Sequence, residues 1–254
     1  MGHRHEIVTF PGHSGELSGN LQIPDGDPRG GVLLAHCFTC SKSLKVTHQI
    51  ASGIEAGGWT VLRFDFTGLG ASEGDFAETS VTTNIQDLEA AARYLSNRGF
   101  GPCAMVGHSL GGAATLLAAG NVDEAKAVVA VAAPSDPDHV AHLFTEPDRD
   151  RVFHEGRATV SIAGRKFEIS KHFFDDLEQH GTADRIAALD RPLLVVHGTA
   201  DTIVEIAEGE KIFAAAKQPK WFSAIPNADH LFVKPGTVER AAAAILAFFD
   251  STIG

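Results

Sequence analysis

Short apolar runs that alternate with helical patterns constrain the fold of this chain more than any other feature. Two strand-like segments, 6–10 and 16–24, open the sequence and are separated by turn-forming residues. The later apolar runs are rich in β-branched or aromatic residues and cover 31–38, 60–66, 103–109, 127–134, 192–198 and 221–226. Helical patterns lie between them, at about 44–56, 82–99, 113–119, 206–217 and 237–250. Continuous apolar strands separated by helices predict an α/β fold, with a mostly parallel sheet covered on both faces.

The interval from Ser135 to about Leu189 interrupts this alternation. It contains prolines and charges but no long apolar strand, and its segment 158–170 alternates on both sides of Ala163-Gly164-Arg165, which predicts a hairpin. We interpret residues 135–189 as a cap or lid inserted into a single domain that spans residues 1–254. The alternative is an insertion with no role at a site.

Composition excludes several classes of partner. A net charge of −11 and the absence of basic clusters argue against nucleic acid. The apolar runs are shorter than the roughly 20 residues that a membrane-spanning helix needs, and the first residues lack the apolar core of a secretory signal. Three cysteines, an odd number, argue against a disulfide framework. We therefore expect a cytoplasmic protein with a small-molecule substrate and no membrane partner, and we leave a homodimer open.

The segment Gly107–Gly111, "GHSLG", matches the G-x-S-x-G pattern of a nucleophile elbow. It follows an apolar strand and precedes an Ala/Leu helix, which is the context that the pattern requires. Gly107 and Gly111 remove side chains that would clash across a sharp turn, and Ser109 can then present its hydroxyl from a strained backbone. With His108 as the variable residue, the pattern predicts Ser109 as a nucleophile; a simple glycine-rich turn is the alternative.

A serine nucleophile needs a base and an acid, and ligands of parallel sheets bind beyond the carboxyl ends of the strands. Asp201 follows the strand 192–198, and His230 follows the last strand, 221–226. The chain order Ser109, Asp201, His230 is the order of a hydrolase triad. We expect His230 to act as general base, and Asp201 to fix its tautomer and stabilise the imidazolium.

Other residues compete for these roles. Asp229 is adjacent to His230, and Asp136 and Asp138 follow an earlier strand where some hydrolases keep their acid. Three histidines that also end apolar runs are interpreted as structural: His36, His108 and His197. For the histidines of the cap, surface and substrate-facing positions stay open: His139, His142, His154, His172 and His180.

Acyl transfer also needs hydrogen-bond donors for the developing oxyanion. The residue after the nucleophile, Leu110, can supply one backbone N–H, and the loop after the strand 31–38 should supply the other. Phe38 is our prediction for that second donor, and Cys37 is the alternative.

Cys37 and Cys40 form a C-x-x-C pattern in the same loop. Redox chemistry, or metal binding together with His36 and His48, would fit the residue types. A zinc site usually needs four spaced ligands, however, and Cys103 lies far along the chain. We therefore favour packing for this pair and expect no metal and no cofactor.

Four segments carry a resemblance to a known family: "HCFTCSKS", "LRFDFTGLGASEGDF", "GHSLGG" and "APSDPDHV". They resemble the α/β-hydrolase superfamily, in particular the hydrolase half of bifunctional bacterial proteins with an osmotically-inducible-protein-C-type peroxidase domain. "HCFT" and "RFDFTGLGASEG" are also similar to cinnamoyl and feruloyl esterases, where H-G-F-T is usual. The resemblance implies a serine esterase with an inserted lid and supports Phe38 as the oxyanion residue. Cys37 replaces the usual glycine, and the sequence ends at Gly254 without a peroxidase-like domain, so no peroxide function is expected.

The predicted function is a carboxylic ester hydrolase that forms an acyl-enzyme on Ser109 with small to medium acyl or aryl-acyl esters. A thioesterase, an amidase or peptidase, and an acyltransferase would use the same triad. From other classes, a non-catalytic ligand-binding protein would be expected to carry a damaged triad, and a C-x-x-C redox protein would depend on Cys37 and Cys40.

Overall fold

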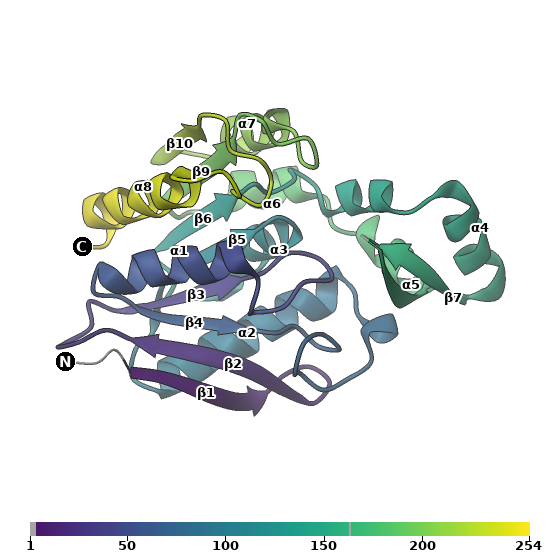
Figure 1. Ribbon diagram of the computed structural model, residues 1–254, viewed down its shortest axis with the longest axis horizontal. Helices are drawn as coiled ribbons and strands as arrows, with labels where there is room; N and C mark the ends of the chain where they lie inside the picture. The colour runs from purple at the N-terminus through teal and green to yellow at the C-terminus, as the bar shows by residue number, and fades with distance from the viewer. Residues whose placement is uncertain (1–3, 163) are drawn as a thin grey trace.

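A computed structural model describes residues 4–162 and 164–254. One eight-stranded sheet crosses the molecule, with strand order β1-β2-β4-β3-β5-β6-β9-β10 (Figure 1). Its strands are β1 (Arg4–Pro11), β2 (Glu16–Ile23), β3 (Gly31–Ala35), β4 (Thr60–Phe64), β5 (Pro102–His108), β6 (Ala127–Val131), β9 (Leu193–Gly198) and β10 (Lys220–Ile225). β1 and β2 pair antiparallel at one edge, and all strands from β4 to β10 in this order pair parallel. This confirms the prediction of a mostly parallel sheet.

Helices cover both faces of the sheet, as the alternating pattern predicted. The helices packed on it are α1 (Lys45–Ala56), α2 (Val81–Asn97), α3 (Leu110–Ala118), α7 (Ile206–Ala215) and α8 (Thr237–Thr252). Helix α6 (Thr182–Ala188) contacts α3 and α7, and the short 3-10 turns η1 (Phe76–Glu78) and η2 (Ala119–Asn121) lie in connecting segments. α1 and α8 share one apolar core with the sheet, and α2 and α3 share the other. Every residue of β3, β4 and β6 is buried between these layers, which explains why β3 and β6 are continuously apolar; β4 also buries Thr60 and Arg63. None of the described helices is long and apolar enough to cross a membrane.

Helix α2 shows how local sequence sets these boundaries. The Ser80 side chain accepts a hydrogen bond from the Thr83 N–H, and the Thr83 hydroxyl accepts one from the Ser80 N–H. This capping box satisfies two of the N–H groups that a helix start leaves without partners. The chain leaves the helix at Gly99, whose φ of 82° suits glycine.

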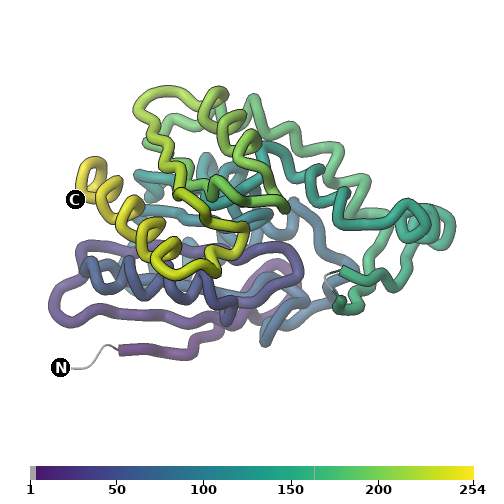
Figure 2. The backbone as a smooth tube through the Cα atoms, turned by 45° about the horizontal axis from the view of Figure 1, so that its top comes forward, coloured from purple at the N-terminus to yellow at the C-terminus, as the bar shows by residue number. Residues whose placement is uncertain are grey.

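The residues between β6 and β9 form the cap (residues 135–189), which projects beyond the carboxyl ends of the strands (Figures 1 and 2). It contains η3 (Pro137–Leu143), α4 (Glu146–Glu155), β7 (Arg157–Ile162), β8 (Arg165–Ser170) and α5 (Lys171–Leu177), followed by α6. β7 and β8 pair antiparallel, so the predicted hairpin is confirmed; Ala163, in its turn, lies outside the described residues. The short helices α4 and α5 were not predicted, and α4 buries only Val152.

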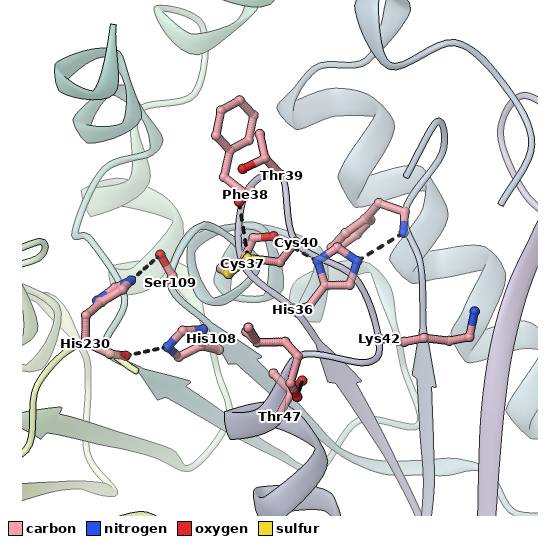
Figure 3. The surroundings of a disulfide bond; sticks show 12 residues. His36, Cys37, Phe38, Thr39, Cys40, Lys42, Thr47, His108, Ser109 and His230 are labelled. Atoms are coloured by element: carbon pink, nitrogen blue, oxygen red, sulfur yellow. Dashed lines mark hydrogen bonds between the residues drawn. A yellow bond between two sulfur atoms is a disulfide. The ribbon is translucent and has the colours of Figure 1, made fainter. Parts of the chain in front are cut away.

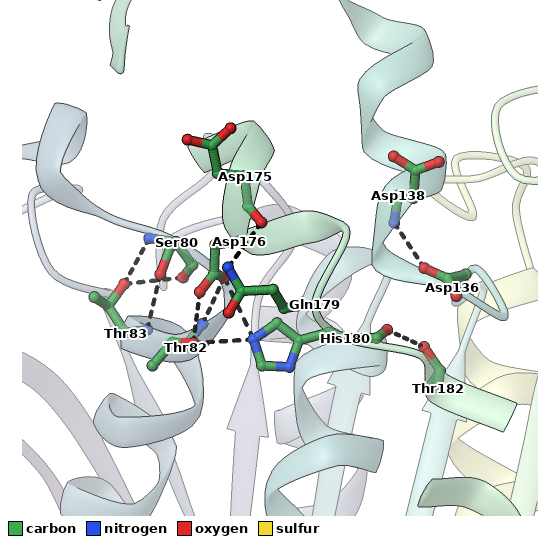
Figure 4. Close-up of polar contacts among 10 residues, drawn as sticks. All are labelled: Ser80, Thr82, Thr83, Asp136, Asp138, Asp175, Asp176, Gln179, His180 and Thr182. Carbon is green, nitrogen blue, oxygen red and sulfur yellow. Dashed lines mark hydrogen bonds and ion pairs between the residues drawn. The ribbon is translucent and has the colours of Figure 1, made fainter. Parts of the chain in front are cut away.

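Polar contacts tie the cap to the body at separate points. At its start, the N–H and hydroxyl of Ser135 donate to Glu208 on α7, at 3.0 and 2.5 Å. Near its end, the N–H and hydroxyl of Thr82, in the first turn of α2, donate to Asp176 at 3.1 and 2.6 Å (Figure 4). In the hairpin, Arg157 forms ion pairs with acidic residues on η1 and next to it. The cap is therefore anchored on both sides of the sheet edge where the strands end.

Candidate active site

Ser109 occupies the sharp turn between β5 and α3. Its φ of 57° and ψ of −129° are unusual for a residue with a side chain, and its N–H donates to the Val131 carbonyl at 2.9 Å. A Cβ at Gly107 would lie 2.3 Å from the carbonyl oxygen of Gly111, and one at Gly111 would lie 2.1 Å from the carbonyl oxygen of His36. Both glycines are thus required by close backbone approach.

The loops after β5, β9 and β10 bring Ser109, Asp201 and His230 together. The Nδ1 of His230 lies 2.8 Å from Oδ2 of Asp201, and its Nε2 lies 3.0 Å from Oγ of Ser109. Both Asp201 and His230 are buried, at 7% and 9% exposure. The other carboxylate oxygen, Oδ1 of Asp201, accepts the N–H groups of Ile203 and Val204, each at 2.9 Å. The carboxylate is therefore held in place from both sides.

These contacts favour an ionised Asp201. Burial opposes the charge, but the hydrogen bond and charge of His230 and the backbone N–H donors outweigh it, so the pKa of Asp201 lies below its ordinary value. The carboxylate accepts the proton on Nδ1 of His230. Nε2 of His230 is then left to accept the hydroxyl proton of Ser109.

His108, next to Ser109 in the sequence, also contacts His230. Its Nε2 donates to the backbone carbonyl of His230 at 2.9 Å (Figure 3). Burial, and secondarily the neighbouring His230, lower the pKa of His108 to about 3, so it stays neutral near pH 7. His108 therefore connects the turn at Ser109 to the backbone of the loop that carries His230.

The competing carboxylates are engaged elsewhere. Oδ1 of Asp229 accepts the Val233 N–H at 3.0 Å within its own loop. Asp136 accepts the Asp138 N–H at 3.0 Å and caps η3 (Figure 4). The carboxylates of Asp229 and Asp136 therefore accept hydrogen bonds within their own turns, whereas Asp201 contacts His230.

The other histidines considered in the sequence analysis lie in the core or in the cap. His197 is fully buried and donates to the Val204 carbonyl at 2.9 Å, and burial lowers its pKa. His139 donates to the Ile203 carbonyl at 3.1 Å, and the His142 ring packs edge-on against it. His180 lies 2.9 Å from the Thr82 hydroxyl, at the base of the cap. The last two cap histidines are exposed: His154 and His172.

The loop of residues 37–40, which we call the oxyanion loop, lies against the start of α3. The His36 Nδ1–H donates to the Cys37 carbonyl at 2.8 Å, and the Cys40 N–H donates to the same oxygen at 3.2 Å. The C=O and N–H of a trans peptide point in opposite directions, so these bonds direct the N–H of Phe38 away from His36. Within the described part of the chain, we find no protein acceptor for that N–H. Leu110 is the first residue of α3, so its N–H has no acceptor within the helix.

His36 is held in one tautomer by this arrangement. Its Nε2 accepts the Phe66 N–H at 3.4 Å while its Nδ1–H donates to Cys37. Burial lowers its pKa, so the neutral ring is favoured. The sequence predicted a structural role for His36, but nothing in it indicated that His36 orients the Phe38 peptide.

Contacts from the cap hold the outer side of the oxyanion loop. The Phe38 ring stacks on Phe173 of α5, with centroids 5.3 Å apart, and lies 5.7 Å from Phe76 of η1. Nη1 of Arg165, on the cap hairpin, donates to the Thr39 carbonyl at 3.0 Å. The position of the Phe38 peptide thus depends partly on the cap.

Cys37 and Cys40 form a disulfide in this loop, which differs from the packing role that we favoured (Figure 3). The odd cysteine count argued only against a framework of several bridges, and a tight turn can bring two nearby cysteines together without one. Cys103 is free, at the other end of β5 from the elbow. In residues 4–162 and 164–254, we find no cluster of three or more His, Cys, Asp or Glu side chains placed to hold a metal.

A pocket of about 220 Å³ opens beside Ser109. Its lining is mostly apolar and comes from the elbow, the oxyanion loop, η3 of the cap and the loop after β9: Phe38, Ser109, Leu110, Pro134, His139, Val140, His142, Leu143, Thr202, Ile203 and Val204. Phe38 and Leu110 line it together with the nucleophile, whereas Cys37 does not. This favours Phe38 over Cys37 for the second N–H.

The sequence of residues 51–254 matches the model of the prolyl oligopeptidase family. The chain belongs to this family. The esterase domain of a Rhodothermus marinus protein is 38% identical, with 99% of this chain and 100% of that domain covered and a TM-score of 0.80. Est1E from Butyrivibrio proteoclasticus, solved with ferulic acid, has a TM-score of 0.85 at 20% identity, with 97% and 99% covered, and shows the shared fold.

Among curated proteins, YfhR of Salmonella typhimurium, which is named as uncharacterized, is 27% identical over 234 residues. The match covers 89% of this chain and 74% of that protein. The family match and the esterase domain at 38% identity place the chain among α/β-hydrolases and support a hydrolase activity in general.

Proposed function

We propose that this protein is a serine carboxylic ester hydrolase. The observation that carries the proposal is the continuous hydrogen-bonded series Asp201–His230–Ser109 beside a pocket that Phe38 and Leu110 also line. A nucleophile within reach of an oriented base, next to two backbone donors, is the arrangement that acyl transfer requires.

In acylation, Nε2 of His230 takes the proton from the Ser109 hydroxyl as Oγ attacks the ester carbonyl carbon. The carbonyl oxygen becomes negative and is stabilised by the N–H groups of Phe38 and Leu110. Asp201 stabilises the imidazolium without taking its proton. The imidazolium then protonates the leaving alcohol, the C–O bond breaks, and an acyl-enzyme remains on Ser109.

Deacylation repeats these steps with water. His230 removes a proton from a water molecule, the resulting oxygen attacks the acyl carbonyl, and the same two N–H groups hold the oxyanion. The proton returns to Oγ of Ser109, and the carboxylic acid leaves. This cycle consumes only water and needs no cofactor.

The pocket supports small to medium acyl or aryl-acyl esters. About 220 Å³ is below the usual range for drug-sized ligands, roughly 300–1,000 Å³. Apolar side chains of the elbow, the cap and the loop after β9, including Leu143 and Ile203, dominate the lining and suit an aliphatic chain or a single aromatic ring. The alcohol part of the ester would extend outside the pocket.

Labelling with a fluorophosphonate probe, followed by peptide mapping, tests the nucleophile. We expect the label on Ser109 and a kcat for p-nitrophenyl acetate about 10⁴- to 10⁶-fold lower in Ser109→Ala than in the wild type. Ser223→Ala, a change in β10, serves as the matched control and should keep both label and rate. Wild-type hydrolysis by Ser109→Ala would remove this serine from the mechanism.

Amide hydrolysis is the second candidate, because the family that matches the chain is named for an oligopeptidase. A panel that pairs each acyl group as ester, thioester and anilide separates the candidates. We expect kcat/KM to be highest for the esters. An anilide or thioester that is hydrolysed faster than its ester would reassign the substrate class while leaving the triad in place.

A further inference from the structure

The Cys37–Cys40 disulfide encloses the peptide that we assign to the oxyanion. Both ends of the loop have independent attachments: His36 holds the Cys37 carbonyl, and the Lys42 N–H, just beyond the loop, donates to buried Asp65 at 2.5 Å. Residues 38–41 lie between these attachments, and within the disulfide itself lie only Phe38 and Thr39. The disulfide is therefore the covalent link across the segment that carries the Phe38 N–H (Figure 3).

The backbone inside the disulfide ring is in an unfavourable conformation. Thr39 has a φ of 58°, in the left-handed region that β-branched residues avoid. Such a conformation persists only where the surroundings hold it. The surroundings here are the disulfide, the contact from Arg165 to the Thr39 carbonyl and the stacking of Phe38 on Phe173.

General stability is a weak explanation for this disulfide. The stabilisation from a crosslink grows with the length of the loop it closes, and this one closes a separation of only three residues. Disulfides of that kind in tight turns beside an active site are better suited to controlling local geometry. Cys40 is also only half-buried, whereas Cys37 is 7% exposed, so Cys40 is the more exposed cysteine of the pair.

We propose that the Cys37–Cys40 disulfide is a reversible thiol–disulfide exchange site, and that its reduction by a dithiol lowers the esterase activity. The inference rests on the proposed function of the same site. A thiolate of the dithiol attacks the Cys40 sulfur, the Cys37–Cys40 bond breaks, and Cys37 leaves as a thiolate that takes a proton. The second thiol of the reductant then attacks the mixed disulfide and releases the Cys40 thiol. Two electrons pass to the protein, and the reductant ends as its own disulfide.

Reduction changes what holds the Phe38 peptide. Sγ of Cys40 lies 3.4 Å from the Phe38 carbonyl oxygen; a disulfide sulfur has no proton to donate, but the Cys40 thiol does. Without the crosslink, Thr39 can leave its left-handed conformation, and the Phe38 N–H is held less firmly toward the pocket. Complete loss of one oxyanion donor typically costs about 10²- to 10³-fold in kcat. Partial loosening should cost less, so we expect roughly a 5- to 50-fold decrease in kcat with a small change in KM.

The test compares oxidised and reduced enzyme on p-nitrophenyl acetate. Dithiothreitol is used for reduction and removed before the assay, because thiols themselves attack p-nitrophenyl esters, and alkylation with mass spectrometry counts the free thiols. We expect kcat to fall on reduction and to recover after reoxidation with oxidised glutathione. Hydrogen–deuterium exchange should increase in residues 37–40 and in the cap segment 165–174, but not around Asp201.

Cysteine variants show whether the change in kcat comes from the Cys37–Cys40 disulfide or from another effect of the reductant. Cys37→Ser/Cys40→Ser should have the kcat of the reduced wild type and no response to dithiothreitol. Cys103→Ser, which removes the free thiol, should respond like the wild type. Unchanged kcat and unchanged exchange after proven reduction would overturn the inference, as would a disulfide that resists dithiothreitol in the folded protein. If neither redox state is labelled at Ser109 or hydrolyses any ester, the proposed function has failed instead, and the inference fails with it.

Discussion

The two halves of the candidate site are held by different parts of the molecule. On the base side, Asp201 and His230 lie in loops that directly follow β9 and β10, and the Asp201 carboxylate is fixed by N–H groups of its own loop. On the oxyanion side, Phe38 depends on a disulfide, on His36 and on the cap. The base side therefore belongs to the sheet, whereas the oxyanion side is sensitive to the cap and to redox state. Perturbations of the two halves should give different kinetic signatures.

The largest effect is expected on the base side. Asp201→Asn keeps an oxygen for the Ile203 and Val204 N–H groups but turns an N–H toward Nδ1 of His230, which favours the wrong tautomer. By analogy with other Ser-His-Asp triads, kcat should fall about 10⁴-fold. Steady-state kinetics on p-nitrophenyl acetate measure this, with Asp229→Asn, the neighbouring carboxylate, as the control. Comparable losses in both variants would contradict the assignment of Asp201 as the acid.

A smaller effect is expected where the oxyanion peptide is oriented. His36→Leu removes the Nδ1–H donor to the Cys37 carbonyl, so the Phe38 N–H should be less well directed. We expect kcat to fall roughly 10- to 100-fold, below the full cost of losing a donor, with KM little changed. A weaker affinity for a trifluoromethyl ketone, which mimics the tetrahedral intermediate, should accompany the loss. If the temperature of thermal unfolding falls but kcat per folded molecule is unchanged, His36 has only a packing role.

The cap contact should have a milder influence. Arg165→Gln removes a charged donor to the Thr39 carbonyl, and because Arg165 is exposed we expect only about a two- to fivefold decrease in kcat. Lys166→Gln, the exposed neighbour on β8, is the matched control and should leave kcat unchanged. Equal behaviour of the two variants would show that the hairpin does not support the oxyanion loop.

The smallest effect on rate is expected at His108, and it should be visible in stability instead. Its folded-state pKa of about 3 lies below the ordinary histidine pKa of 6.5, so between these pH values the unfolded chain binds a proton that the folded chain does not. Stability is lost as pH falls through this window. In His108→Gln, whose amide can still donate to the His230 carbonyl, the decrease between pH 7 and 5 should be smaller by about 2 kcal/mol.

Urea unfolding at the two pH values measures this difference. The kcat of His108→Gln at pH 7 should stay within a few-fold of wild type. An identical acid response in variant and wild type would show that His108 is not the buried neutral group that the structure indicates.

The sequence predicted the fold and the meeting of the triad loops because these depend on repeated, local signals. Apolar runs define the strands, and residues at the carboxyl ends of parallel strands share one edge of the sheet, which is where Ser109, Asp201 and His230 meet. The predicted hairpin of the cap followed from strict alternation in the same way.

The support of the oxyanion loop could not be predicted in this way. Backbone donors leave no side-chain signature, so Phe38 was chosen by position and resemblance. The stacking of Phe38 on Phe173 and the bond from Arg165 to Thr39 join residues more than 120 positions apart, with no periodic pattern to indicate the pairing. Helix α4 is polar and lacks the apolar stripe that reveals a helix, and α5 has only seven residues, too few for its apolar residues to show a helical period.

Gly111 has a consequence that extends beyond its own turn. The space where its side chain would be is filled by the His36 carbonyl, so the nucleophile helix and the strand end that leads to Phe38 rest directly on each other's main chain. Because Gly111 has no Cβ, the two segments can lie close together, and this closeness determines the distance between the N–H groups of Phe38 and Leu110 that we assign to the oxyanion hole. A larger residue at position 111 would push these two N–H groups apart. Ser109 and His230 could then still contact each other, but the negative charge of the tetrahedral intermediate would not be stabilised.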